Sequence, residues 1–69
     1  MESEKERLLA LLKYLIEHNG EHSKELTELA EKSKAITKDV VLNNIRKAAR
    51  TMNEATGYLK QALEEADKN

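Results

Sequence analysis

The chain has 69 residues, 36% of them charged, a net charge of −1 at neutral pH, and no cysteine, proline, tryptophan or phenylalanine. A chain of this length forms one domain at most, so we expect a single helical domain over residues 1–69. The lack of cysteine excludes disulfides and thiolate metal sites. The longest apolar run, residues 8–12, is far too short to span a bilayer, and no signal peptide is recognisable. We therefore expect a soluble, cytoplasmic protein without a membrane role.

The first half of the sequence carries an apolar stripe with polar residues at its centre. The stripe keeps one direction when successive residues are advanced by about 100°, which predicts a single helix over about residues 3–34. The alternative is a break at Asn19-Gly20, since both residue types often end helices, and this would give a three-helix bundle. The stripe consists of Leu8, Leu12, Leu15, Asn19, His22, Leu26, Leu29 and Ser33.

The second half predicts a long helix over about residues 38–66, with Thr37 as its N-cap. Apolar residues recur there at alternating spacings of four and three, the heptad pattern of a helix packed lengthwise against another helix. Many of these residues are alanine, so a partner helix can approach closely. The predicted seam consists of Val41, Ile45, Ala48, Met52, Ala55, Leu59, Ala62 and Ala66.

The two predicted helices are nearly equal in length, which favours an all-α antiparallel helical hairpin over the three-helix bundle. If the chain reverses near Ile36, the numbers of facing residues sum to about 72. Apolar residues flank both seams, and one partner helix cannot cover them. Two hairpins that form a four-helix bundle would cover them, so we expect a homodimer.

Both histidines of the chain lie at the centre of the first stripe. His18 and His22 are four residues apart, so a helix projects both imidazoles from one face. Glu21 follows His18 by three residues, and Glu25 follows His22 by three. These four residues are a candidate site for a divalent transition metal such as zinc, nickel, cobalt or iron. The alternatives are a polar histidine–asparagine layer that fixes the register of the bundle, or a histidine that caps a helix end.

Charge is distributed in blocks along the chain. Residues 1–31 contain four basic and eight acidic residues, whereas residues 32–53 contain six basic residues and one acidic residue. Residues 23–50 can be read as a helix-turn-helix whose basic block, 32–50, meets DNA. The reading we favour pairs the basic block with the acidic first helix, which makes nucleic-acid binding the alternative function. The expected pairs join Glu21, Glu25 and Glu28 to Arg46, Lys47 and Arg50.

The sequence contains no motif for catalysis and indicates no small-molecule substrate. It has no glycine-rich loop and no cysteine, and none of its serines lies in a nucleophile motif. We therefore expect a non-enzymatic, self-associating helical module with a polar centre of histidine and asparagine.

One short motif resembles a known group of proteins. The stretch His18-Asn19-Gly20-Glu21-His22, with Leu29-Ala30-Glu31-Lys32 and Met52-Asn53-Glu54-Ala55 after it, is similar to small all-helical proteins of archaea and anaerobic bacteria that carry a His-Asn-x-Glu-His motif. The resemblance covers about residues 8–63 of the sequence. It implies a small all-helical fold and no particular reaction.

Overall fold

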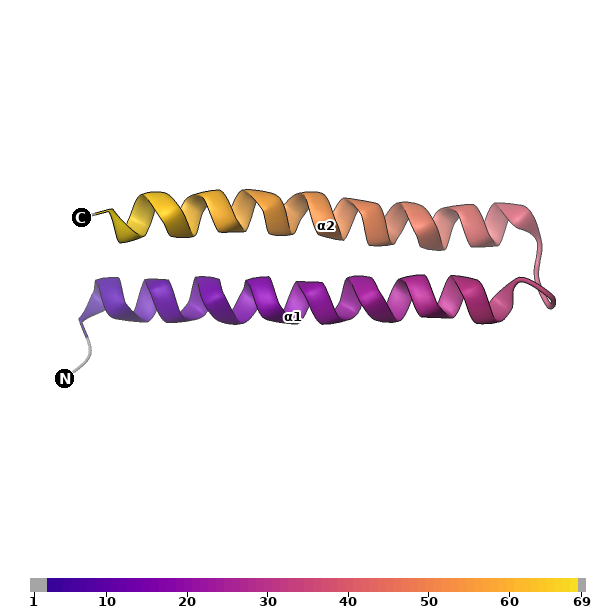
Figure 1. The fold of residues 1–69 in the computed structure, drawn as a ribbon, viewed down its shortest axis with the longest axis horizontal. Helices are drawn as coiled ribbons and strands as arrows, with labels where there is room; N and C mark the ends of the chain where they lie inside the picture. Colours follow the sequence, from indigo (N-terminus) through magenta and orange to yellow (C-terminus); the bar gives the residue numbers. More distant parts are fainter. Residues whose placement is uncertain (1–2, 69) are drawn as a thin grey trace.

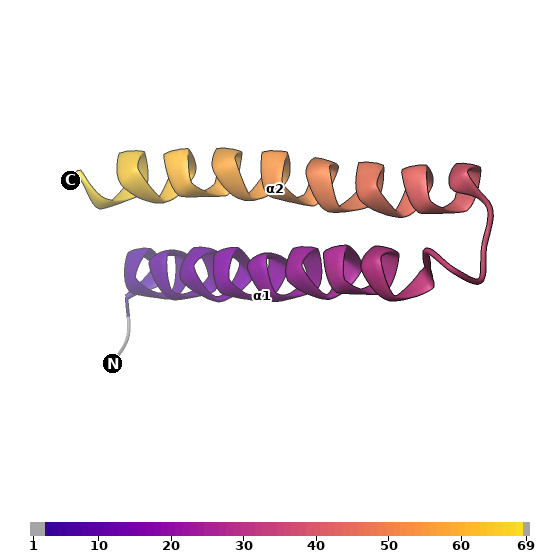
Figure 2. The same ribbon diagram turned by 45° about the vertical axis from the view of Figure 1, so that its right-hand side comes forward.

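The computed structural model describes residues 3–68 and consists of two long antiparallel helices joined by a short turn (Figure 1). Helix α1 spans Glu4–Ser33 and helix α2 spans Asp39–Asp67. The two helices lie side by side along their length, as the turned view in Figure 2 also shows. The predicted all-α hairpin is therefore confirmed, with each helix end within one residue of its expected position. Residues 1–2 and 69 of the expected domain lie outside the described residues.

The two helices begin differently. The hydroxyl of Ser3 accepts a hydrogen bond from the Glu6 backbone N–H at 3.1 Å and donates one to the Glu6 carboxylate at 3.3 Å. This pairing of the N-cap with the third helical residue resembles a capping box. At α2 the N-cap is Lys38, in an extended conformation and without a side-chain capping bond. The prediction that Thr37 caps α2 was wrong because the chain enters the helix one residue later.

Helix α1 passes through Asn19-Gly20 without a break. No residue of the described chain has a positive φ, so the left-handed conformation that commonly ends helices is absent from residues 3–68. The three-helix alternative is therefore wrong. Glycine inside a helix costs about 1 kcal/mol relative to alanine, and tertiary packing of an apolar face is what usually outweighs such a cost.

The helices pack through a line of residues that differs in part from the one expected: every second residue of each predicted seam is half-buried, and the others are displaced by one position. Each buried residue stands one position after a residue that we placed in a seam. Both helices are thus turned about their axes from the predicted orientation, by less than the 100° that separates successive residues. The buried residues are Ser23, Ala30, Leu42, Ala49 and Thr56.

The centre of the contact explains this rotation. Ser23 and Ala49 are each 5% exposed, and the Ser23 hydroxyl donates a hydrogen bond to the Ala49 carbonyl oxygen at 3.3 Å. Their numbers sum to the expected 72, which confirms the predicted reversal. A buried polar group without a hydrogen bond destabilises the fold. The observed rotation buries a serine that has a partner and leaves the adjacent His22 partly exposed.

The hairpin encloses little core. Its Cα atoms extend over 52 × 20 × 11 Å with a radius of gyration of 15.9 Å, whereas a compact domain of this length has about 11 Å. Its accessible surface is 5574 Å², about 1,200 Å² more than the roughly 4,400 Å² of a compact monomer of this mass. Among the residues that the structure describes, no large side chain is fully buried. One hairpin therefore leaves much apolar surface in contact with water.

Replacement of Gly20 by alanine should stabilise the protein. An added Cβ meets no atom within 4 Å, so Gly20→Ala should raise the free energy of unfolding by up to about 1 kcal/mol. Urea denaturation followed by circular dichroism measures this. Gly57→Ala is the matched control, because Gly57 lies inside α2 with equally open space. If Gly57→Ala raised the free energy of unfolding and Gly20→Ala lowered it, a continuous α1 would be contradicted.

A pair of alanine substitutions tests the rotation of α2. Leucine at the buried Ala49 would press on Ser23 and overpack the contact, so Ala49→Leu should lower the free energy of unfolding by about 1–3 kcal/mol. Ala48 is exposed, and Ala48→Leu should change the free energy of unfolding by less than about 0.5 kcal/mol. Both variants are compared by thermal denaturation at low protein concentration. If Ala48→Leu destabilised the protein more than Ala49→Leu, Ala48 would lie in the contact and the observed rotation would be refuted.

Candidate functional site

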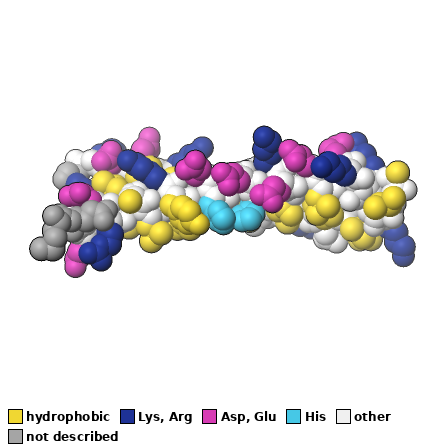
Figure 3. All heavy atoms as spheres, turned by 90° about the horizontal axis from the view of Figure 1, so that it is seen from below, with side chains coloured by type: hydrophobic (Ala, Val, Ile, Leu, Met, Phe, Trp, Pro, Cys, Tyr) yellow, Lys and Arg dark blue, Asp and Glu magenta, His cyan; other side chains and the backbone are white. Residues whose placement is uncertain are grey.

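Helix α1 carries a second apolar line beside the one that contacts α2. Its residues alternate between spacings of three and four from Leu8 to His22, and Leu29 follows one heptad later, with Glu25 at the position between; they share one side of the helix. Leu8, Leu11 and Leu29 are 49%, 55% and 49% exposed. Figure 3 shows hydrophobic side chains in a row that two histidines interrupt, with acidic side chains beside them. We call this line the α1 stripe; it consists of Leu8, Leu11, Leu15, His18, His22 and Leu29.

Helix α2 adds small residues on the same side of the hairpin. A groove there is lined by Asn19 of α1 and by α2 residues that include Ala48 and Ala55. Heptad spacing adds Val41 and Ala62 to this side, and all four residues are exposed. We call the α1 stripe and these four residues together the apolar face. Within residues 3–68, neither helix combines the length and apolar character needed to cross a membrane.

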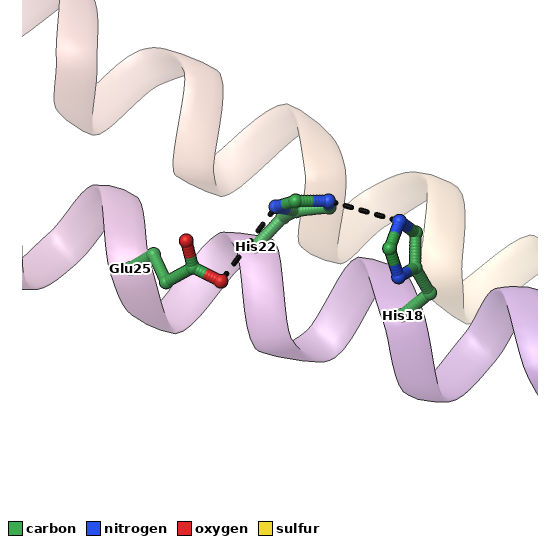
Figure 4. A network of polar contacts seen from close by, with 3 residues as sticks. All are labelled: His18, His22 and Glu25. Atoms are coloured by element: carbon green, nitrogen blue, oxygen red, sulfur yellow. Dashed lines mark hydrogen bonds and ion pairs between the residues drawn. The ribbon is translucent and has the colours of Figure 1, made fainter.

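The two histidines meet at the middle of the α1 stripe. Their Nε2 atoms are 3.0 Å apart, within hydrogen-bonding distance, and the rings pack edge to face with centroids 4.3 Å apart. Tyr14, one turn earlier, stacks on His18 with ring centroids 5.4 Å apart. Figure 4 shows the two Nε2 atoms pointing toward each other and the Glu25 carboxylate on the other side of His22. The helix spacing therefore brings the imidazoles together, as the sequence predicts.

The direction of the histidine–histidine hydrogen bond depends on the tautomers of the two rings. One neutral ring must donate from Nε2 while the other accepts at Nε2. The Glu25 carboxylate oxygen lies 3.8 Å from Nδ1 of His22, and its negative charge favours a proton on Nδ1. That tautomer makes His22 the acceptor at Nε2 and His18 the donor.

The four residues predicted as metal ligands do not act alike. His18 and His22 present converging nitrogens, whereas Glu25 lies beside the opposite nitrogen of His22 and orients that ring. Glu21 makes no hydrogen bond or ion pair with any described residue and lies about 100° around the helix from His22. Residues 3–68 hold no group of three or more histidine, cysteine, aspartate or glutamate side chains placed for a metal ion. One chain therefore brings two candidate ligand nitrogens together.

The sequence analysis missed Tyr14 as part of this cluster. Its position four residues before His18 was the available signal, because side chains at that spacing meet on a helix surface. The Tyr14, His18, His22 and Glu25 side chains form a continuous column along α1.

The basic block meets α1 at a different place from the one expected. Arg46 lies 3.9 Å from the Glu31 carboxylate, and Lys34 lies 2.8 Å from it. The hydrogen bond and the positive charge from Lys34, with a smaller contribution from Arg46, lower the pKa of Glu31 below its usual value. These groups are exposed, so their contribution to stability is small. The predicted pairs of Glu21, Glu25 and Glu28 with α2 are not formed among the described residues, because the rotation turns these carboxylates elsewhere.

These features define a class of protein: an antiparallel two-helix hairpin with one uncovered apolar face and a histidine pair at its centre. The chain belongs to the family described as "Domain of unknown function (DUF8180)", whose model matches residues 8–66. The matched residues include the whole apolar face. Comparisons with curated proteins and with solved structures found no match.

The tautomers of the two histidines can be measured directly. Long-range proton–nitrogen NMR spectra at mildly basic pH should show His22 protonated on Nδ1 and His18 protonated on Nε2, because Glu25 attracts the His22 proton. In a Glu25→Ala variant, the preference of His22 for Nδ1 should weaken. Glu28→Ala, which removes a carboxylate one turn further from His22, is the control and should leave both tautomers unchanged. The same Nε2 tautomer on both rings of the wild type would contradict the assignment.

Proposed function

We propose that this chain is a non-enzymatic helical module that self-associates, with two hairpins packing their apolar faces together into a homodimeric four-helix bundle. The exposed apolar face carries this proposal. The hairpin exposes about 1,200 Å² more total surface, polar and apolar together, than a compact monomer of its mass. A standard stable interface takes roughly 800 Å² from each partner, so the elongated hairpin has room for one.

A second copy of the chain fits this face better than an unrelated partner. The face is mostly aliphatic: Glu25 lies in line with the α1 stripe and Lys47 lines the groove, whereas ion-paired residues such as Glu31 and Arg46 lie off it. A two-fold axis places one patch against itself, so such a patch must complement itself. Both faces are long and straight, which suits lengthwise helix packing at about 20°.

The histidine pair supports a second candidate function, the binding of a divalent transition metal, because its two Nε2 atoms converge. DNA binding is less well supported by the geometry. A helix-turn-helix joins its helices at about 90–120°, whereas α1 and α2 lie antiparallel over their whole length. Arg46 of the basic block also pairs with Glu31 inside the hairpin.

A charge placed in the α1 stripe should prevent association. Glu in place of Leu11 would be buried without a partner in the dimer, which costs several kcal/mol, so Leu11→Glu should weaken the dimer at least about 100-fold. Sedimentation equilibrium over a range of concentrations measures this. The matched control is Ala10→Glu, since Ala10 is exposed next to Leu11 but lies off the stripe. A wild-type protein that stays monomeric into the millimolar range would overturn the proposal.

A further inference from the structure

We propose that two copies of the hairpin hold one divalent transition-metal ion between their histidine pairs, with His18 and His22 of each copy as its four ligands. This inference rests on the proposed self-association. It begins from a mismatch: each chain presents two converging imidazole nitrogens, yet residues 3–68 bring no third ligand to them. A tetrahedral site needs four ligands. A two-fold symmetric dimer supplies four, because each chain contributes two histidines.

The distance between the nitrogens fits a shared ion. Two ligand nitrogens bound at about 2.0–2.1 Å to one tetrahedral zinc ion lie about 3.4 Å apart. The Nε2 atoms of His18 and His22 are 3.0 Å apart, so a ring movement of a few tenths of an ångström, with the His18 proton transferred from Nε2 to Nδ1, admits the ion. Both rings are only partly buried and lie on the apolar face, so a partner can reach them without rearrangement of the hairpin.

The spacing of the α1 stripe brings the two pairs together. When the stripe packs antiparallel on its own copy with the two-fold axis level with Gly20, His18 faces the partner subunit's His22. In the same register, Leu15 faces the partner subunit's Glu25 and Leu11 faces the partner subunit's Leu29, so a pair of leucines lies one turn beyond each side of the polar layer. The four imidazoles then converge at the axis, which is the centre of the interface.

Glu25 completes the electrostatics of the site. Four neutral imidazoles leave the two charges of the metal ion uncompensated. The Glu25 carboxylate next to Nδ1 of His22 supplies one negative charge per copy, and the pair balances the ion. A carboxylate behind a ligating histidine also fixes the tautomer that frees Nε2 for the metal. This gives Glu25 an orienting role in place of the ligand role expected from the sequence.

The experiment titrates Zn²⁺ into metal-free full-length protein by calorimetry and measures association by sedimentation equilibrium, with and without EDTA. We expect one Zn²⁺ per two chains and a dimer dissociation constant at least about tenfold lower with Zn²⁺, because an ion that binds only the dimer stabilises it. Co²⁺ in place of Zn²⁺ should give the intense visible absorption of tetrahedral coordination.

Three variants separate the contributions. His18→Ala/His22→Ala should lose the binding heat and the effect of Zn²⁺ on association while it remains a folded helical protein by circular dichroism. Glu25→Gln should weaken Zn²⁺ binding by about 10–100-fold, the usual cost of removing a partner of a ligating histidine. Leu11→Glu keeps both histidines but prevents association, so it should also weaken Zn²⁺ binding at least about tenfold.

The outcomes distinguish this inference from the proposed function. A wild type that is dimeric in EDTA and binds no Zn²⁺ overturns the metal site and leaves self-association standing. Binding of one Zn²⁺ per chain, unchanged in Leu11→Glu, overturns the shared site. A chain that is monomeric both with EDTA and with Zn²⁺ overturns both proposals.

Discussion

The contact between Ser23 and Ala49 fixes how the two helices are turned, and the other surfaces of the protein follow from it. Small side chains at this layer let the backbones approach, and the serine hydroxyl has its partner in the Ala49 carbonyl. Because Ser23 faces α2, His22 is turned to the flank of the hairpin. Because Ala49 faces α1, Ala48 is turned to the same flank. The helix contact and the apolar face are thus two results of one rotation.

Two helices alone cannot cover the apolar surface that this sequence encodes. Each helix presents one line of residues to its neighbour, but α1 has two adjacent lines that are rich in leucine. A chain of this size is marginally stable even when its apolar residues are well buried. Stability and association are therefore expected to be linked, since a partner that binds only the folded hairpin shifts the folding equilibrium toward it.

The hairpin itself could be predicted from the sequence because it depends on heptad spacing and on two helices of equal length. The unbroken phase across Gly20 correctly predicted a continuous α1, and the histidine spacing correctly predicted converging rings. The rotation of the helices could not be predicted, because neighbouring apolar lines differ little in hydrophobicity. The choice between them depends on backbone approach and on one hydrogen bond across the contact. The position of Glu25 beside Nδ1 of His22 could not be predicted either, because it depends on the side-chain conformations of both residues.

A polar pair in the middle of a leucine stripe also has a consequence for register. A stripe of leucine alone could slide by one heptad against its copy and bury nearly the same area. With the histidines present, a shift of seven residues places His18 against the partner subunit's Leu15 or the partner subunit's Leu29, so neither histidine faces a histidine of the partner. Only the central register pairs histidine with histidine. A buried polar residue at one seam position selects register in this way at some cost in stability. A shared metal ion would use the same register. The same two histidines can therefore bind a metal ion and select the register of the dimer.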